Sequence, residues 1–189
     1  MDAMIGSPGK GGAIDPAGFK DSNGDRYLVY KVDGNSLSPG GPCGNGGPNR
    51  SPTPLMLARL AGDGIRPIGN PTTLLNREDR DGPLIEAPSL AKLGDGSYAL
   101  FFSSNCWNSP FYDVSWATSR SVAGPYTRKD SMMKTGTGGL VAPGGASVSE
   151  DGQHMVFHAN HEEGRAMYTT RLGGGGADLR LMFLDDPKT

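Results

Sequence analysis

Apolar residues along the chain gather in short runs that are bounded by glycine, proline, asparagine and aspartate. Three pairs of these runs are joined by an Asn-Gly or Asp-Gly turn, with the turn glycines at Gly24, Gly96 and Gly152. Such a dipeptide between two apolar runs is the strongest short-range signal for a β-hairpin. No long segment places apolar residues at helical spacing, which would be needed for an amphipathic helix. The pattern therefore predicts an all-β chain.

Each hairpin begins one copy of a longer unit. Its first two strands are expected at 13–19 and 27–31, at 84–90 and 98–103, and at 142–148 and 154–158. A third strand is expected at 54–60, 113–119 and 165–172, and an outer fourth strand is suggested at 66–68 and 124–127. Four strands that recur in this way are typical of propeller blades. We predict a partial β-propeller of about three four-stranded antiparallel blades over residues 1–172. Residues 173–189 form a glycine-rich joint and a C-terminal segment, either an extra strand or a tail.

One carboxylate interrupts an apolar run, namely Glu86 in Leu-Ile-Glu-Ala-Pro-Ser-Leu. A buried charge is costly unless it is paired or has a function. The first strand of each blade lines the axis of a propeller, and the repeat places Asp15 and Glu86 at matching positions. Two carboxylates brought together cannot both ionise freely, so one pKa rises, as the acid of glycoside hydrolysis requires. Taken singly, Asp15 is better explained as a turn residue before Pro16 and Glu86 as a strand-edge charge, and it is the matched position in two repeats that favours a function.

The same segments carry a family resemblance. Residues 13–31 resemble the central blade of glycoside hydrolase family 43, and 84–90 with 98–105 look like its acid-bearing blade. Residues 119–126 are similar to its usual blade ending, and 142–159 to its last blade. The resemblance covers about residues 10–172, and it is greatest to fungal members with a Gly-Pro-Cys-Gly-Asn insertion.

The resemblance implies a five-bladed propeller that acts with inversion on arabinose- or xylose-containing polysaccharides. It implies an Asp base, a second Asp that tunes pKa and orients the substrate, and a Glu acid. By motif, Asp15 corresponds to the tuning Asp and Glu86 to the acid. The base belongs to a first blade upstream of anything similar here, so we expect an N-terminally truncated chain, inactive if the base is missing. The alternatives are a non-catalytic carbohydrate-binding or structural remnant, and an interaction module.

Four further residues are candidates for substrate binding, namely Asn105, Trp107, His158 and Arg165. Trp107, like Tyr112 in the same loop, could stack on a sugar face or pack on the loop itself. Arg165 resembles a family arginine that faces the pocket, with a solvated strand end as the alternative. His158 is interpreted as a satisfied histidine near the pocket. A last-blade histidine of the family is replaced by glycine.

Composition limits the partners and cofactors. The chain has 189 residues with 18 basic and 20 acidic side chains and a net charge of −2. There is no basic stripe, so nucleic acid is not an expected partner, and no apolar run approaches a membrane span. We expect a monomer that binds a plant cell-wall polysaccharide or oligosaccharide, with no cofactor and no metal site.

The N-terminus shows no signal-peptide pattern, although the resemblance implies an extracellular protein. Cys43 and Cys106 either form a disulfide or remain free thiols.

Overall fold

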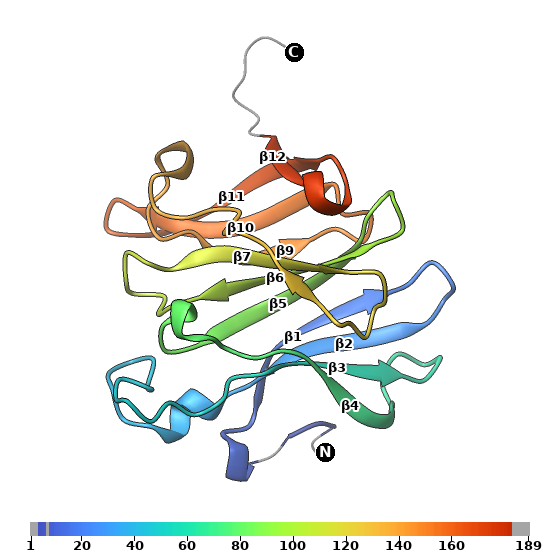
Figure 1. The fold of residues 1–189 in the computed structure, drawn as a ribbon, viewed down its shortest axis with the longest axis horizontal. Helices are drawn as coiled ribbons and strands as arrows, with labels where there is room; N and C mark the ends of the chain where they lie inside the picture. Colours follow the sequence, from blue (N-terminus) through green and yellow to red (C-terminus); the bar gives the residue numbers. More distant parts are fainter. Residues whose placement is uncertain (1–3, 7, 183–189) are drawn as a thin grey trace.

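The computed structural model describes residues 4–6 and 8–182 and consists of three four-stranded antiparallel β-sheets (Figure 1). The first sheet contains β1 (Ala13–Lys20), β2 (Arg26–Val32), β3 (Leu55–Leu60) and β4 (Pro67–Leu75). The second contains β5 (Ile85–Lys92), β6 (Tyr98–Ser104), β7 (Asp113–Ser119) and β8 (Thr127–Arg128). The third contains β9 (Gly144–Val148), β10 (His154–His161), β11 (Gly164–Gly173) and β12 (Arg180–Met182). The all-β prediction of three four-stranded blades is confirmed.

Short 3₁₀ helices connect some of the strands. They are η1 (Pro8–Lys10), η2 (Gly34–Leu37), η3 (Asp79–Asp81), η4 (Thr137–Gly139) and η5 (Gly176–Asp178). The turn glycines at positions 24, 96 and 152 have φ angles of 89°, 80° and 69°. Residues other than glycine rarely adopt this region, so the predicted hairpin turns form where glycine permits them.

The second sheet lies between the other two, and two apolar layers hold the three blades together (Figure 1). The layer between the first and second sheets includes Phe19, Val29, Leu57, Leu90, Leu100 and Phe102. The layer between the second and third sheets includes Ala99, Phe101, Trp116, Met155 and Phe157. Every residue of β6 is buried, because both faces of this strand pack on a neighbouring blade. This explains why its sequence is a continuous apolar run and does not alternate.

The C-terminal segment contributes a strand to the third blade. Strand β12 pairs with β11 through Arg171 with Met182 and Leu172 with Leu181. Residues 180–182 therefore form an outer strand, which settles for them the choice between strand and tail. The remainder of the predicted C-terminal segment, 183–189, lies outside the described residues.

The inner strand of every blade carries a bulge at the same place. Ile14 pairs with Lys31, Glu86 with Ser103 and Gly144 with His158, and the register shifts directly afterwards in each strand. The next residue has a positive φ in all three blades, namely 54° at Asp15, 52° at Ala87 and 61° at Gly145. Asp15 therefore matches Ala87, and Glu86 matches Ile14. The expectation that Asp15 and Glu86 occupy equivalent positions was wrong by one residue, because a bulge is set by strand pairing.

Candidate active site

Glu86 projects from the bulge of β5 into a pocket of about 440 Å³. Its side chain is 17% exposed. The Tyr112 hydroxyl donates a hydrogen bond of 2.8 Å to Oε1, and the Lys31 ammonium lies 3.7 Å from Oε2. One carboxyl group thus has a neutral donor on one oxygen and a cation near the other.

Burial is the largest influence on Glu86, and it raises the pKa of this carboxyl group above its usual range. The charge of Lys31 and the hydrogen bond from Tyr112 act in the opposite direction, while the negative charges of Asp15 and Asp33 add to the increase. The sequence predicts that Asp15 is the cause of a raised pKa at Glu86. The structure corrects this, since loss of water contributes more than the neighbouring carboxylate.

Lys31 is a member of the site that the sequence argument missed. It is only 1% exposed, and its Nζ atom donates to Asp33 Oδ1 at 2.8 Å. Side chains two residues apart in a strand share a face, and Lys31 shares that of the buried Val29 in β2. This alternation was the available signal, because it places a cation on a buried face.

Asp15 reaches Glu86 from the neighbouring blade. Its Oδ2 atom accepts a hydrogen bond of 2.9 Å from the backbone N–H of Ala87, the residue after the acid. Asp15 therefore ties the bulge of β1 to the bulge of β5. The predicted proximity of the two carboxyl groups holds, although it arises between adjacent inner strands at non-equivalent positions.

Tyr112, His158 and Arg165 form one packed group beside Glu86. The Tyr112 and His158 rings stack with centroids 6.1 Å apart, and the Arg165 guanidinium lies 5.5 Å from the Tyr112 ring centroid. Arg165 Nε donates to His158 Nδ1 at 2.7 Å, and Nη2 donates to the backbone oxygen of Ala142 at 2.7 Å. Burial, followed by the charge of Arg165, lowers the pKa of His158. Arg165 is thus engaged with protein acceptors and is not a solvated strand end.

The loop after β6 brings Trp107, but not Asn105, to the Glu86 pocket. Trp107 lines this pocket and is 48% exposed. A disulfide joins Cys43 to Cys106, across a sequence separation of 63 residues, and Cys43 lines the same pocket. Asn105 instead lines a separate polar pocket of about 220 Å³, and its Nδ2 atom donates to Ser104 Oγ at 3.1 Å.

The turn at residues 21–25 links the first blade to the second. Asp21 accepts hydrogen bonds from Lys92 Nζ at 2.7 Å and from the Tyr98 hydroxyl at 2.5 Å, both in the next blade. Within residues 4–6 and 8–182, no group of three or more His, Cys, Asp or Glu side chains could hold a metal ion. None of the helices among the described residues is long and apolar enough to cross a membrane.

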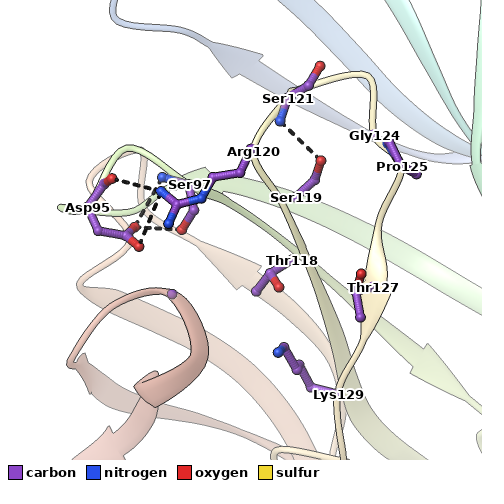
Figure 2. Close-up of a pocket in the computed structure, with 11 residues that line it drawn as sticks. Asp95, Ser97, Thr118, Ser119, Arg120, Ser121, Gly124, Pro125, Thr127 and Lys129 are labelled. Atoms are coloured by element: carbon purple, nitrogen blue, oxygen red, sulfur yellow. Dashed lines mark hydrogen bonds and ion pairs between the residues drawn. The ribbon is translucent and has the colours of Figure 1, made fainter.

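A larger depression of about 550 Å³ lies on the second blade around Asp95, Arg120 and Lys129 (Figure 2). Ser97 Oγ donates to Asp95 Oδ1 at 2.6 Å, and Arg120 Nη1 lies 3.9 Å from Asp95 Oδ2. Ser97 and Arg120 therefore both pair with Asp95. Glu86 does not line this depression, so we assign the candidate chemistry to the smaller pocket.

Comparison with known proteins identifies the family of the chain. The model of glycosyl hydrolases family 43 matches residues 2–173. The chain belongs to this family. A comparison with curated protein sequences found no match. The N-terminal truncation and the similarity to fungal members stay predictions.

Several solved structures share the fold. A thermostable family-43 glycoside hydrolase matches with a TM-score of 0.72 and 23% identity, over 89% of this chain and 57% of its own. An endo-1,4-β-xylanase from Bacteroides thetaiotaomicron has a TM-score of 0.69 and 21% identity, over 90% and 58%. An exo-1,5-α-L-arabinanase from a bovine ruminal metagenomic library has a TM-score of 0.67 and 20% identity, over 89% and 56%. The family-43 chain thus spans less than three fifths of each of these proteins, and its three sheets form a partial β-propeller.

Proposed function

We propose that this chain carries the general acid of a glycoside hydrolase that cleaves arabinose- or xylose-containing polysaccharides with inversion. One observation carries the proposal, namely the Glu86 carboxyl group, which lies in a pocket and has a pKa raised by burial. A raised pKa increases the fraction of a carboxyl group that is protonated at a given pH, as a general acid requires. The substrate class is supported by the xylanase and arabinanase among the solved structures.

In this mechanism Glu86 transfers its proton to the glycosidic oxygen as the bond from that oxygen to the anomeric carbon breaks. A water molecule attacks the opposite face and gives its proton to a base. The two carboxyl groups of an inverting enzyme lie roughly 6.5–9.5 Å apart, which leaves room for this water. Lys31 stabilises the carboxylate that remains on Glu86, and the exposed face of Trp107 offers a stacking surface for a sugar ring.

We propose that no residue among those described serves as the base. Asp33 Oδ1 is paired with Lys31, and Asp15 Oδ2 accepts the Ala87 N–H, so each carboxylate already has one oxygen engaged and we assign neither as the base. We propose that the base lies on polypeptide beyond the blades described, as the family resemblance implies. The occupied state of both carboxylates also favours a second candidate function, carbohydrate binding without hydrolysis.

We also propose an extracellular location. The Cys43–Cys106 disulfide supports it, because such bonds persist in oxidising compartments.

The two functions are separated by offering the chain aryl α-L-arabinofuranosides and β-D-xylosides together with azide. Azide is a small anion that can attack the anomeric carbon in place of base-activated water. The hydrolase proposal predicts a glycosyl azide of inverted configuration, detected by NMR, and its loss in Glu86→Gln. Calorimetric binding of xylan or arabinan oligosaccharides without cleavage would support the second function. Cleavage that does not depend on Glu86 would overturn the acid assignment.

A further inference from the structure

The two oxygens of the Glu86 carboxyl group have different surroundings. Oε1 accepts the 2.8 Å hydrogen bond from Tyr112. Oε2 lies 3.7 Å from Lys31 Nζ, which is itself bonded to Asp33 at 2.8 Å. A separation of 3.7 Å is too long for a hydrogen bond. Oε2 is therefore the oxygen without a fixed donor.

The Tyr112 ring is held in place with its hydroxyl oxygen beside Oε1. The residue is 3% exposed, with one ring face stacked near His158 and with Arg165 5.5 Å from the ring centroid. A Cβ atom on Gly144 would overlap the Tyr112 ring, so the inner strand β9 also closes against it. Groups from the third blade thus fix a tyrosine that contacts the acid of the second blade.

Tyr112 acts only as a donor in this contact. Burial and the charge of Glu86 raise the pKa of the tyrosine well above its usual value, so it keeps its proton. A protonated carboxyl group has one hydroxyl oxygen and one carbonyl oxygen, and the carbonyl oxygen is the better acceptor. A fixed donor at Oε1 therefore assigns the carboxyl proton to Oε2.

We propose that Tyr112 is a positioning residue that holds Glu86 Oε1 as the acceptor, so that Oε2 carries the proton given to the leaving oxygen. The inference rests on the proposed function of Glu86 as the acid. Three charged groups act on the pKa of Glu86, namely Lys31 in β2, Asp33 directly after β2, and Asp15 in β1. Lys31 faces the oxygen that loses the proton and stabilises its charge after transfer.

The test replaces Tyr112 with phenylalanine, which removes the hydroxyl and keeps the packed ring. Tyr126→Phe is the matched control, because this tyrosine is also buried and donates at 3.1 Å to the backbone oxygen of Val122. Glutamate carboxyl carbons are labelled with ¹³C and titrated by NMR, with Glu86 assigned from its missing signal in Glu86→Gln. Melting curves confirm that both variants are folded.

The titration midpoint of Glu86 should move upward by about one pH unit in Tyr112→Phe, since a hydrogen bond to the ionised form is lost. It should stay at the wild-type value in Tyr126→Phe. A midpoint in Tyr112→Phe that is unchanged or lower would overturn the inference. No substrate is needed, so this result is independent of whether the chain hydrolyses a glycoside.

Kinetics in azide adds a readout that a merely structural role would not change. A misplaced acid slows substrates with poor leaving groups, whereas dinitrophenyl glycosides leave without protonation. Tyr112→Phe should therefore lower kcat at least tenfold for an unsubstituted phenyl glycoside and much less for the dinitrophenyl glycoside. An equal loss on both substrates would contradict the positioning role. If Glu86→Gln itself changed neither rate, the proposed function would fail, while the titration would still decide the contact.

Discussion

Replacing Lys31 with methionine should raise the titration midpoint of Glu86. The substitution keeps most of the length of the buried side chain and removes the cation 3.7 Å from Oε2. At an effective dielectric constant of 20, this attraction is about 4 kcal/mol. Water around the 17% exposed Glu86 side chain screens part of this attraction. If about half survives, the midpoint should rise by roughly 1–2 pH units, since one unit corresponds to about 1.4 kcal/mol.

A second variant should shift the titration midpoint of Glu86 in the opposite direction. Asp33→Asn removes a negative charge that raises the pKa of Glu86, so its midpoint should fall while that of Lys31→Met rises. Both are measured by ¹³C NMR of labelled glutamate, and Lys31→Met/Asp33→Asn should fall between the single variants. The electrostatic reasoning is refuted if Lys31→Met leaves the midpoint in place or lowers it, provided that melting shows a folded protein.

Three further predictions concern stability. Because the folded pKa of Glu86 is raised, this residue destabilises the folded state only as the pH rises above its pKa in the unfolded state. Glu86→Gln should therefore raise Tm at pH 8 and not at pH 4. An equal gain at both pH values would contradict burial as the cause. Burial raises the pKa of Asp21, but the hydrogen bonds from Lys92 and Tyr98 outweigh it and lower the pKa. The stabilisation by Asp21 is therefore present at neutral pH and is lost as the pH falls through the folded pKa. Asp21→Asn should cost about 1–3 kcal/mol in urea unfolding at pH 7 and little at pH 2, and a cost that persists at pH 2 would disprove the linkage. Removing the disulfide with Cys43→Ser/Cys106→Ser should cost about 4 kcal/mol for a loop that spans a sequence separation of 63 residues and lower Tm. An unchanged Tm would show that the loops are held by other contacts.

The blades were predictable because their signals are local. Each hairpin depends on a glycine at a positive φ, as at Gly24 and Gly96, and the repeat of apolar runs then reveals the architecture. Strand β12 was harder, since it has three residues and gains its identity only by pairing with β11. Its formation depends on a partner strand and not on its own propensity.

The candidate site was only partly predictable, for the same reason. Glu86 is conspicuous because it interrupts an apolar run, and the propeller geometry brings Asp15 near it. The bulge that offsets these residues depends on pairing between strands, which a linear pattern does not contain. Tyr112 became part of the site only through its contacts with Glu86 and the third blade. Asn105 was misplaced because its side chain turns toward Ser104 and another pocket.

The position of Glu86 gives the fold a cost that the chemistry explains. A carboxyl group with a pKa raised by burial destabilises the folded state at neutral pH, and the surrounding Lys31 and Tyr112 reduce this penalty without removing it. Such local conflict is common at functional sites, where stability is given up for reactivity.

The most direct test of the central claim compares the wild-type chain with Glu86→Gln on two aryl glycosides of different leaving-group ability, in the presence of azide. Proton donation contributes about 10²–10⁴-fold to the rate of a step that needs it. We predict that Glu86→Gln lowers the rate of cleavage at least about 100-fold for the glycoside with the poor leaving group and only slightly for the dinitrophenyl glycoside. Rates that are indistinguishable between the two proteins on both substrates would contradict the assignment of Glu86 as the acid.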